Sequence, residues 1–511
     1  MLGSRLTVGS QDGVPHDARE ETRGRGARAP RAGAAGRPLL WPAAVASAFT
    51  LTQLVLVVPG LGLGWDETVY VSQVSPQAPA AFFSAPRARG ITFLVAPVAT
   101  LTTSTEALRI YLAVLAGCGL FLALWVWRRL LPAPVLAVAG ALFASLWVTM
   151  FYGPQAMPNL WVAYGALTAV GCFLRAARDP GDHRALIGLG AGVAFVALMR
   201  PSDAVWLALS LAVAAVLMRA GRRPLLLVVL AAGTALGCAE WIIEAYVRYD
   251  GLFPRLRRGS EIQGHLGWHV AIDDHVRALG GRALCRPCDV PWRHPLTALW
   301  FFALPLLVAG GVWAAAHTRH RAEIVLATVV GLALAAPYLF TVDYAAPRFL
   351  LPAYALLALP VAQCLLRAWR AGPRRRPAAV ALVAVAVAAH LAIQYRVLDG
   401  IVNRVRADTA AITRIAAELR AKGVRPPCLI TGEEAIRVAF RTGCASRQPT
   451  GHDASITPEG LAGAALRNPV ALLHSGDRHP PPYARLWRVH PLPDLGPRTD
   501  YRAYLSPTAS P

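Results

Sequence analysis

Long stretches without a charged side chain recur along the chain, separated by short segments rich in arginine. The first runs from Leu39 to Trp65, longer than the ~20 residues that an α-helix needs to cross the ~30 Å hydrocarbon core of a bilayer. The pattern predicts a polytopic α-helical membrane protein with about 11 transmembrane helices, over residues 39–61, 108–127, 133–151, 158–174, 185–199, 203–218, 224–246, 295–316, 323–342, 349–366 and 377–396.

The fifth and sixth predicted spans are shorter than the others. Arg184 and Arg200 bound the fifth, Asp203 and Arg219 bound the sixth, and both intervals are shorter than ~20 residues. They form either a tilted pair or a re-entrant hairpin, and later segments have the same sidedness in both cases.

The distribution of arginine predicts the orientation of the spans. Cytoplasmic connections of membrane proteins carry an excess of basic residues. Every second connection here is rich in arginine, at residues 128–129, 175–184, 219–223, 319–321 and 367–376, whereas residues 152–157 contain no basic residue. With an odd number of spans, the amino terminus should therefore lie in the cytoplasm and the carboxyl-terminal part outside the plasma membrane.

The composition agrees with a membrane protein and excludes a soluble domain. Of the 511 residues, 55% are hydrophobic and only 16% are charged. The net charge of +22 comes almost wholly from arginine, because Lys422 is the only lysine. Since the arginines lie mainly between spans and in the amino-terminal tail, and no basic domain with interleaved aromatic residues occurs, we expect no nucleic-acid partner.

Three regions are predicted along the chain. Residues 1–38 are polar and rich in arginine and read as a disordered cytoplasmic tail. Residues 39–397 form the transmembrane domain, with a large outer loop over residues 248–294. Residues 398–511 read as a small extracytoplasmic α/β domain, with a helix over 403–422, a strand over 428–431, a helix over 433–441 and a strand over 470–473.

The cysteines and histidines outside the spans give weaker signals. Cys285 and Cys288 lie in the outer loop, and Cys428 and Cys444 in the carboxyl-terminal domain, so each pair could form a disulfide. His265 and His269 have a spacing compatible with a metal site on a helix, but the glycines among them argue against a helix.

An acidic pair, Asp66 and Glu67, follows the first span directly. Asp66 must lie within about one helical turn of the bilayer surface, and carboxylates held there usually react or bind a ligand. The position suits a base that acts on substrates carried by a lipid.

Several short segments resemble, in order, the GT-C glycosyltransferases, in particular the bacterial relatives of protein O-mannosyltransferases and aminoarabinose transferases. Asp66-Glu67-Thr68-Val69-Tyr70 is similar to the family's Asp-Glu-x-x-Tyr in the first exported loop. Met199-Arg200-Pro201-Ser202 resembles its basic-Pro turn between two short spans. Further matches are Ser84-Ala85-Pro86-Arg87-Ala88-Arg89-Gly90, Thr105-Glu106-Ala107-Leu108-Arg109, Arg128-Arg129, and the stretch from Tyr344 to Pro352 that contains Arg348.

The resemblance implies an enzyme of the plasma membrane that transfers a sugar, a hexose or a pentose, from a polyprenyl-phosphate-sugar donor. Membrane lipid is then a partner, and the acceptor is a glycan, a lipid or a protein outside the cytoplasm. Transfer is expected to proceed with inversion by direct displacement. The rival interpretation is a non-catalytic membrane protein of the same fold, or a transporter of lipid-linked sugars.

Two residues are expected to be catalytic. Asp66 is the candidate base for the acceptor hydroxyl, and Glu67 is either a second catalytic group or one that orients the acceptor or a cation. Tyr70 completes the motif and is expected to bind substrate. Where relatives often carry an acid in the second exported loop, this chain has Asn159, which is expected to bind substrate by hydrogen bonding but cannot add a negative charge to a metal site. A divalent cation is therefore left as an open cofactor.

The remaining candidates would bind substrate. Arg348, next to Tyr344 at an outer span end, can clamp a phosphate, or it can pair with Asp343 or extend to the headgroups. Arg200 has the same alternatives, with Asp203 as its partner. Glu240 lies one turn before Glu244 and two turns before Arg248, and contact with substrate or an internal ion pair are both open.

Overall fold

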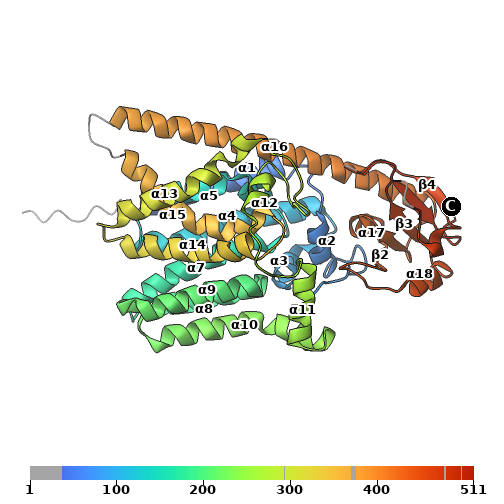
Figure 1. Ribbon diagram of the computed structural model, residues 1–511, viewed down its shortest axis with the longest axis horizontal. Coiled ribbons are helices and arrows are strands. Elements are labelled where there is room, and N and C mark those ends of the chain that lie inside the picture. The colour runs from blue at the N-terminus through green and yellow to red at the C-terminus, as the bar shows by residue number, and fades with distance from the viewer. Residues whose placement is uncertain (1–36, 293, 370–375, 477–478, 497, 511) are drawn as a thin grey trace, which may run out of the picture. The chain divides into compact units, whose positions relative to one another are not determined.

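The structure is a computed structural model of the chain, and it describes residues 37–510 apart from residues 293, 370–375, 477–478 and 497. The predicted tail over residues 1–38 lies outside the described residues up to position 36. Helices make up most of the described chain, and a small β-sheet lies near its carboxyl terminus (Figure 1).

The helices before the sheet are α1 (Arg37–Thr52), η1 (Gln53–Val57), α2 (Trp65–Ser72), α3 (Gly90–Ala99), α4 (Thr105–Val126), η2 (Trp127–Arg129), α5 (Ala133–Ser145), α6 (Trp147–Tyr152), α7 (Pro158–Arg178), α8 (His183–Met199), α9 (Pro201–Leu217), η3 (Arg219–Gly221), α10 (Pro224–Arg248), α11 (Leu252–Ile262), α12 (Ile272–Ala278), η4 (Pro295–Ala298), α13 (Leu299–Ala315), α14 (Arg321–Phe340), η5 (Pro347–Leu350), α15 (Leu351–Trp369) and α16 (Arg376–Ala421).

Eight helices of the described chain are long and apolar enough to cross a membrane: Leu40–Val57, Thr105–Arg129, Pro158–Arg178, Pro224–Arg248, Pro295–Ala315, Arg321–Phe340, Pro347–Trp369 and Pro377–Ala421. Each coincides with one of the predicted spans. The other three predicted spans coincide with the shorter apolar helices α5, α8 and α9. The protein is therefore a polytopic helical membrane protein, as predicted, while the count of eleven crossings stays a prediction.

The span predicted over residues 133–151 is wrong as a single helix, because the chain breaks at Leu146. This residue is extended, with φ −61° and ψ 132°, and separates α5 from α6. The first N–H groups of a helix lack intrahelical partners. Here the backbone N–H of Trp147 donates to Oε1 of Gln394 on α16, at 2.7 Å. A side chain from a helix that is distant in the sequence thus stabilises the start of α6.

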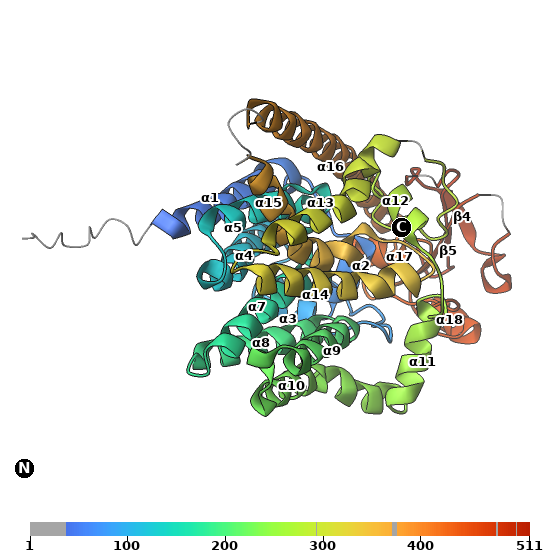
Figure 2. The same ribbon diagram turned by 60° about the vertical axis from the view of Figure 1, so that its left-hand side comes forward.

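The two short predicted spans form two distinct helices with Arg200 between them. Arg200 is extended, with φ −154°, as expected for a residue that precedes proline. The helices α8, α9 and α10 pack side by side (Figure 2). Small residues permit the close approach of α8 and α10: a Cβ at Gly237 would lie 2.2 Å from the carbonyl oxygen of Ala194.

The helix α7 lies at the centre of the bundle. It packs against α4, α8 and α15, and 94% of its apolar window is buried inside the protein. By contrast, α10 and α13 expose most of their apolar residues, including Leu236, Ile243 and Leu306. Exposed apolar side chains on outer helices are what a lipid environment requires.

The carboxyl-terminal region forms a three-layer α/β domain. Its remaining elements are β1 (Leu429–Gly432), α17 (Ala435–Thr442), β2 (Ala445–Ser446), α18 (Pro458–Ala465), β3 (Val470–His474), η6 (Pro482–Ala484), β4 (Arg488–Pro491) and β5 (Arg502–Leu505). The sheet order is β2-β1-β3-β5-β4, with β2, β1 and β3 parallel and the last two pairings antiparallel.

Alternate residues of β3 pack on opposite faces of this sheet, as period-two geometry requires. Ala471 and Leu473 join a core with α16 and α17, whereas Val470 and Leu472 join one with α18. The predicted strands near 428–431 and 470–473 are confirmed. The helix expected to start at 403 instead begins at Arg376, so α16 continues unbroken through the predicted domain boundary at residues 397 and 398.

Both cysteine pairs form disulfides. Cys285 joins Cys288 in the outer loop, and Cys428 joins Cys444 in the carboxyl-terminal domain.

A buried ion pair fixes the segment between α1 and α3. The side chain of Arg109 on α4 is fully buried and donates from Nη1 and Nη2 to the two carboxylate oxygens of Glu67, at 2.5 and 2.8 Å. Its other N–H groups donate to the carbonyl oxygens of Leu61, Gly62 and Pro154.

The carboxylate of Glu67 accepts two further bonds, from the backbone N–H groups of Gly64 at 2.8 Å and Ala156 at 2.7 Å. The first of these caps α2 at its start. Two segments that are far apart in the sequence are thereby held on one guanidinium.

Replacing Arg109 by methionine should destabilise the protein strongly, because Glu67 and three carbonyl groups would stay buried without their donor. Breaking a buried pair from one side costs about 3–5 kcal/mol. Thermal unfolding in detergent measures the effect, with Arg257→Met as a control, since Arg257 is exposed on α11 and no described residue forms a hydrogen bond or ion pair with its side chain. Arg109→Met combined with Glu67→Leu should recover part of the loss. An unchanged melting temperature for Arg109→Met would contradict this role.

Candidate functional site

The Asp66 carboxylate lies between two guanidinium groups. Nη2 of Arg87 donates to Oδ1 at 2.8 Å, and Nη2 of Arg348 donates to Oδ2 at 3.0 Å. The Asp66 side chain remains 32% exposed, whereas those of Arg87 and Arg348 are 12% and 10% exposed. Asp66 is thus fixed from one side and accessible from the other.

The charge environment keeps Asp66 ionised. Burial alone would raise the pKa of its carboxyl, but the charges of Arg87 and Arg348 outweigh burial and hold the pKa below the usual range. The charge of Arg200 acts in the same direction. Asp66 is therefore a carboxylate at neutral pH.

Arg87 is held in place from several sides. Its Nε donates to Oγ of Ser84 at 3.0 Å, and its guanidinium lies 5.3 Å from the ring centres of both Trp65 and Tyr70. Tyr70 is buried, with its ring against the edge of Phe83. Burial raises the pKa of the Tyr70 hydroxyl, so it is a neutral donor.

Arg348 is positioned by the short helix η5 and by the outer loop. Nη1 donates to the carbonyl oxygen of Ala283 at 3.0 Å and to the hydroxyl of Tyr152 at 3.4 Å. The expected alternative, a pair between Arg348 and Asp343, does not occur in the described structure, because Asp66 takes that place. The structure thus joins two sequence candidates that lie far apart in the chain.

Arg200 contributes a third guanidinium with free donors. Its Nε lies 3.2 Å from Oδ2 of Asp203, the partner predicted from the sequence. The guanidinium also lies 5.3 and 5.1 Å from the ring centres of Tyr338 and Phe349. Neither Nη1 nor Nη2 has a hydrogen-bond partner in the part of the chain that the structure describes.

Tyr344 lies close to this group. Its ring packs against the edge of Phe349, and the guanidinium of Arg286 lies 4.6 Å from the ring centre. Burial raises the pKa of the Tyr344 hydroxyl, while Arg348 and Arg200 act in the opposite direction.

Two of the substrate-binding candidates from the sequence, Glu240 and Asn159, lie elsewhere. Glu240 is 3.3 Å from Nε of Arg89, in a cluster with Glu244 and Arg255. Arg255 holds the segment between α2 and α3 through the carbonyl oxygens of Ala85 and Arg87. The expected pair of Glu244 with Arg248 is present at 3.5 Å, but Glu244 lies closer to Arg89 and Arg255.

Asn159, the second residue of α7, is buried, and no described residue forms a hydrogen bond with its amide group. No hydrogen bond links it to Asp66 within the described chain.

Sequence reasoning assigned no role to two residues that the structure brings to the site. Arg87 lies in a segment that the resemblance identified, but nothing in the sequence singles it out from its neighbour Arg89. Asp453, between β2 and α18, interacts electrostatically with both Asp66 and Arg87, and burial raises its pKa. Arg447 ties the same segment to the carbonyl oxygen of Ala80, at 3.3 Å.

The described residues do not fit a divalent cation at Asp66. Both Asp66 oxygens accept from guanidinium groups, both Glu67 oxygens are engaged, and Asn159 carries no charge. Among the described residues, no group of three or more His, Cys, Asp or Glu side chains could hold a metal. We therefore assign no step to a cation.

Comparison with known proteins gives a match in structure only. No family model matches the chain, and no curated protein matches its sequence. The crystal structure of ArnT from Cupriavidus metallidurans bound to undecaprenyl phosphate is similar with a TM-score of 0.64 and 14% identity, covering 94% of this chain and 100% of that one. The apo state of the same ArnT gives a TM-score of 0.63 and 14% identity, over 93% and 99% of the two chains.

Archaeal oligosaccharyltransferase AglB from Archaeoglobus fulgidus, in complex with an inhibitory peptide and a dolichol-phosphate, gives a TM-score of 0.49 at 14% identity, over 84% of this chain and 69% of that one. At 14% identity, the ArnT likeness is one of fold. It extends over nearly the whole chain, membrane helices and carboxyl-terminal domain included. The protein therefore has the GT-C fold that its motifs resemble.

Proposed function

We propose that the protein is a membrane glycosyltransferase that moves a sugar, a hexose or a pentose, from a polyprenyl-phosphate-sugar donor to an acceptor outside the plasma membrane. The observation that carries the proposal is the Asp66 carboxylate, partly exposed and held by Arg87 and Arg348, with the free Nη groups of Arg200 nearby. The undecaprenyl phosphate bound to ArnT, a protein of the same fold, supports a polyprenyl phosphate as the carrier.

In this reaction Asp66 is the base. The acceptor hydroxyl oxygen attacks the anomeric carbon, its proton passes to the exposed side of the Asp66 carboxylate, and the bond from that carbon to the phosphate oxygen breaks. Polyprenyl phosphate leaves with the bonding electrons, and direct displacement inverts the anomeric centre. Because Arg87 and Arg348 fix both carboxylate oxygens, little reorganisation is needed when the acceptor arrives.

The departing phosphate gains negative charge, which nearby cations stabilise. Arg200 has two unengaged Nη groups, so it can bind phosphate oxygens in a forked geometry. Arg348, which donates to Asp66, then links the bound phosphate to the base. Tyr70 and Tyr344 are neutral hydroxyls that can donate to the sugar or the phosphate.

Glu67 has a positioning role in this scheme. Among the described residues, its carboxylate accepts hydrogen bonds from Arg109 and from the backbone N–H groups of Gly64 and Ala156, and its side chain is only 3% exposed. Asn159 and Glu240 receive no part in the reaction.

The proposal includes a location: the plasma membrane, with the amino terminus in the cytoplasm and Asp66, the outer loop and the α/β domain outside. Comparing envelope glycans, lipids and glycoproteins by mass spectrometry, with and without the gene, would identify the sugar and the acceptor. Release of polyprenyl phosphate by the purified protein then measures turnover. Transport of the lipid-linked sugar without such release would favour the transporter.

Asp66→Asn should abolish transfer while the protein still folds and inserts, because the amide keeps the shape but cannot accept a proton. The loss of a general base typically lowers kcat by about 10²- to 10⁴-fold. Turnover on a confirmed donor measures this, with Asp494→Asn as a matched control at an exposed carboxylate. Near-normal turnover of the Asp66 variant would refute the assignment.

Arg200→Ala should raise the donor KM by roughly 10- to 150-fold, the value of a charge-assisted hydrogen bond. Arg348→Ala should raise the donor KM as well and also lower kcat, because Asp66 loses one of its two partners, and Arg348→Lys should recover part of both. Donor titration in nanodiscs is run beside melting curves, with Arg257→Ala as the control. If both alanine variants melt lower but keep the donor KM, the arginines are structural.

The location can be tested by impermeant thiol labelling of intact cells. In a chain whose four unpaired cysteines are replaced by alanine, cysteines at Ala80 and Arg467 should react, and one at Pro180 should not, because the first two positions lie in the proposed outer regions. All three positions are exposed. Labelling of Pro180→Cys alone would reverse the sidedness and exclude an extracytoplasmic acceptor.

A further inference from the structure

A cavity of about 420 Å³ lies next to the outer loop, away from the residues proposed to react. Its lining comes from α12, the segment that follows it, η4 and the middle of α16. The residues that matter here are Arg277, Arg282, Trp292, Thr297 and Arg404. A volume of this size is typical of sites for small ligands or lipid headgroups.

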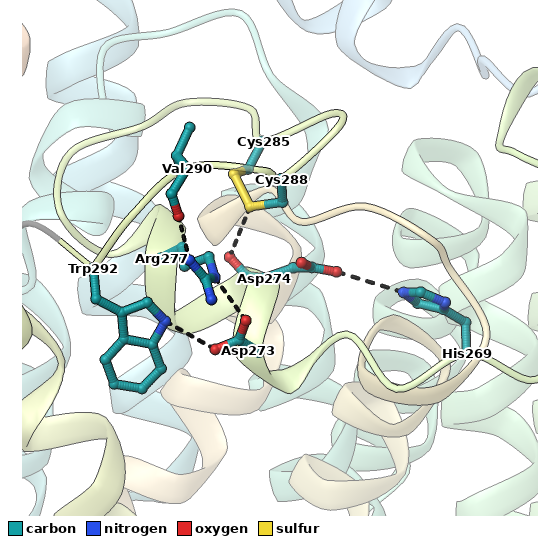
Figure 3. The surroundings of a disulfide bond; sticks show 8 residues. All are labelled: His269, Asp273, Asp274, Arg277, Cys285, Cys288, Val290 and Trp292. Carbon is teal, nitrogen blue, oxygen red and sulfur yellow. Dashed lines mark hydrogen bonds and ion pairs between the residues drawn. A yellow bond between two sulfur atoms is a disulfide. The ribbon is translucent and has the colours of Figure 1, made fainter.

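The cavity carries an excess of positive charge. The charge of Arg277 is compensated by Asp273, to which its Nε donates at 2.6 Å. The Arg277 guanidinium also donates to the carbonyl oxygen of Val290 (Figure 3). Asp273 in turn accepts from the indole N–H of Trp292 at 2.9 Å. Arg282, by contrast, is half-buried, and no described residue forms a hydrogen bond or ion pair with its side chain.

Arg404 adds a second donor to this wall. Its Nη1 donates to the carbonyl oxygen of Gly281 at 3.1 Å, and its charge acts on the carboxyl group of Asp408, one turn along α16. A guanidinium without a partner in a concave site calls for an anion, and phosphate matches its forked donors.

The cavity continues into a surface that faces lipid. Pro295 and Thr297 in its wall belong to the start of the candidate span Pro295–Ala315, of which only 22% is buried inside the protein. Leu296, Leu299 and Phe302 are exposed there, and Trp292 stacks on Phe302 with ring centres 6.2 Å apart. Positive charge thus lies directly beside an apolar surface, at the level where the membrane span begins.

We propose that this cavity binds the phosphate headgroup of an anionic membrane lipid, with Arg282 and Arg404 on the phosphate and the acyl chains along the exposed face of α13. The apolar surface favours a lipid over a soluble phosphate, because the acyl chains of a lipid bound at the cavity can pack on Leu299 and Phe302, whereas a soluble ion gains no such contact. The site is separate from the proposed donor site and does not depend on catalysis.

The bound lipid would stabilise the segment that positions Arg348 and, through it, Asp66. The segment of residues 281–285 lies between the two: Gly281 accepts from Arg404, and Ala283 accepts from Arg348, the partner of Asp66. Cys285 also exchanges two backbone hydrogen bonds with Ala345, three residues before Arg348. The lipid is therefore a positioning ligand.

Native mass spectrometry of the full chain, released from nanodiscs with equal amounts of phosphatidylglycerol and phosphatidylcholine, tests the proposal. The wild type should retain phosphatidylglycerol selectively. Arg282→Gln with Arg404→Gln should weaken that retention by roughly tenfold or more, whereas Arg282→Lys alone should keep most of it. Arg257→Gln, the control for the single variant Arg282→Gln, removes one positive charge from an exposed position on α11 and should leave the retention unchanged.

Three results would overturn the proposal: equal retention of the two lipids, unchanged retention in the double variant, or an equal loss in Arg257→Gln. If the double variant does not fold, Arg282→Gln alone is compared with Arg282→Lys. Competition with glycerol 1-phosphate separates the sources of phosphate, since displacement of the lipid at matched concentration would mean a soluble ligand. Asp66→Asn should bind the lipid normally, so failure of the enzymatic proposal and failure of this one are distinguishable.

Discussion

The arrangement of the segments around Asp66 depends on one buried ion pair, Arg109 with Glu67. All five N–H groups of the guanidinium are used, two on the carboxylate and three on backbone carbonyl oxygens, so no donor of this fully buried side chain is left unsatisfied. The pair joins the end of the first span, the start of α2 and the segment before α7. Asp66 is the neighbour of Glu67 on α2. The ion pair between Glu67 and Arg109 therefore sets the direction in which the Asp66 side chain points.

Around Asp66 the balance of charge is unusual for a carboxylate. Two guanidinium groups bond to it and a third acts on it, so positive charge surrounds Asp66 before any substrate arrives, and Asp203 beside Arg200 and Asp453 near Arg87 offset part of that charge. A low pKa makes Asp66 a weak base in isolation. A bound phosphate would offset part of that positive charge and would thereby raise the proton affinity of Asp66. Donor binding and base strength are then linked through the same arginines.

The sequence predicted those parts of the structure that depend on local pattern. Charge-free length identifies membrane helices because the bilayer core requires it, and short apolar runs identified β1 and β3 because both strands are buried. Asp66 and Arg348 were found from their positions at span ends. The contacts that hold them were not, because periodicity carries no information on which distant residue a side chain meets. Glu67 and Arg109 are 42 residues apart, and Trp147 and Gln394, which define the break before α6, are 247 apart.

The continuity of α16 restricts how this protein can change in evolution. Val397 and Val402 belong to the core of the membrane domain, while Ile412 and Ile415, on the same 46-residue helix, belong to the core of the α/β domain. A single residue inserted between these two sets would turn one domain against the other by about 100° and shift it by about 1.5 Å. Insertions and deletions in that stretch therefore rotate one domain relative to the other. Changes of length in this interval are therefore confined to near-whole numbers of helical turns, which preserve the orientation of one domain relative to the other.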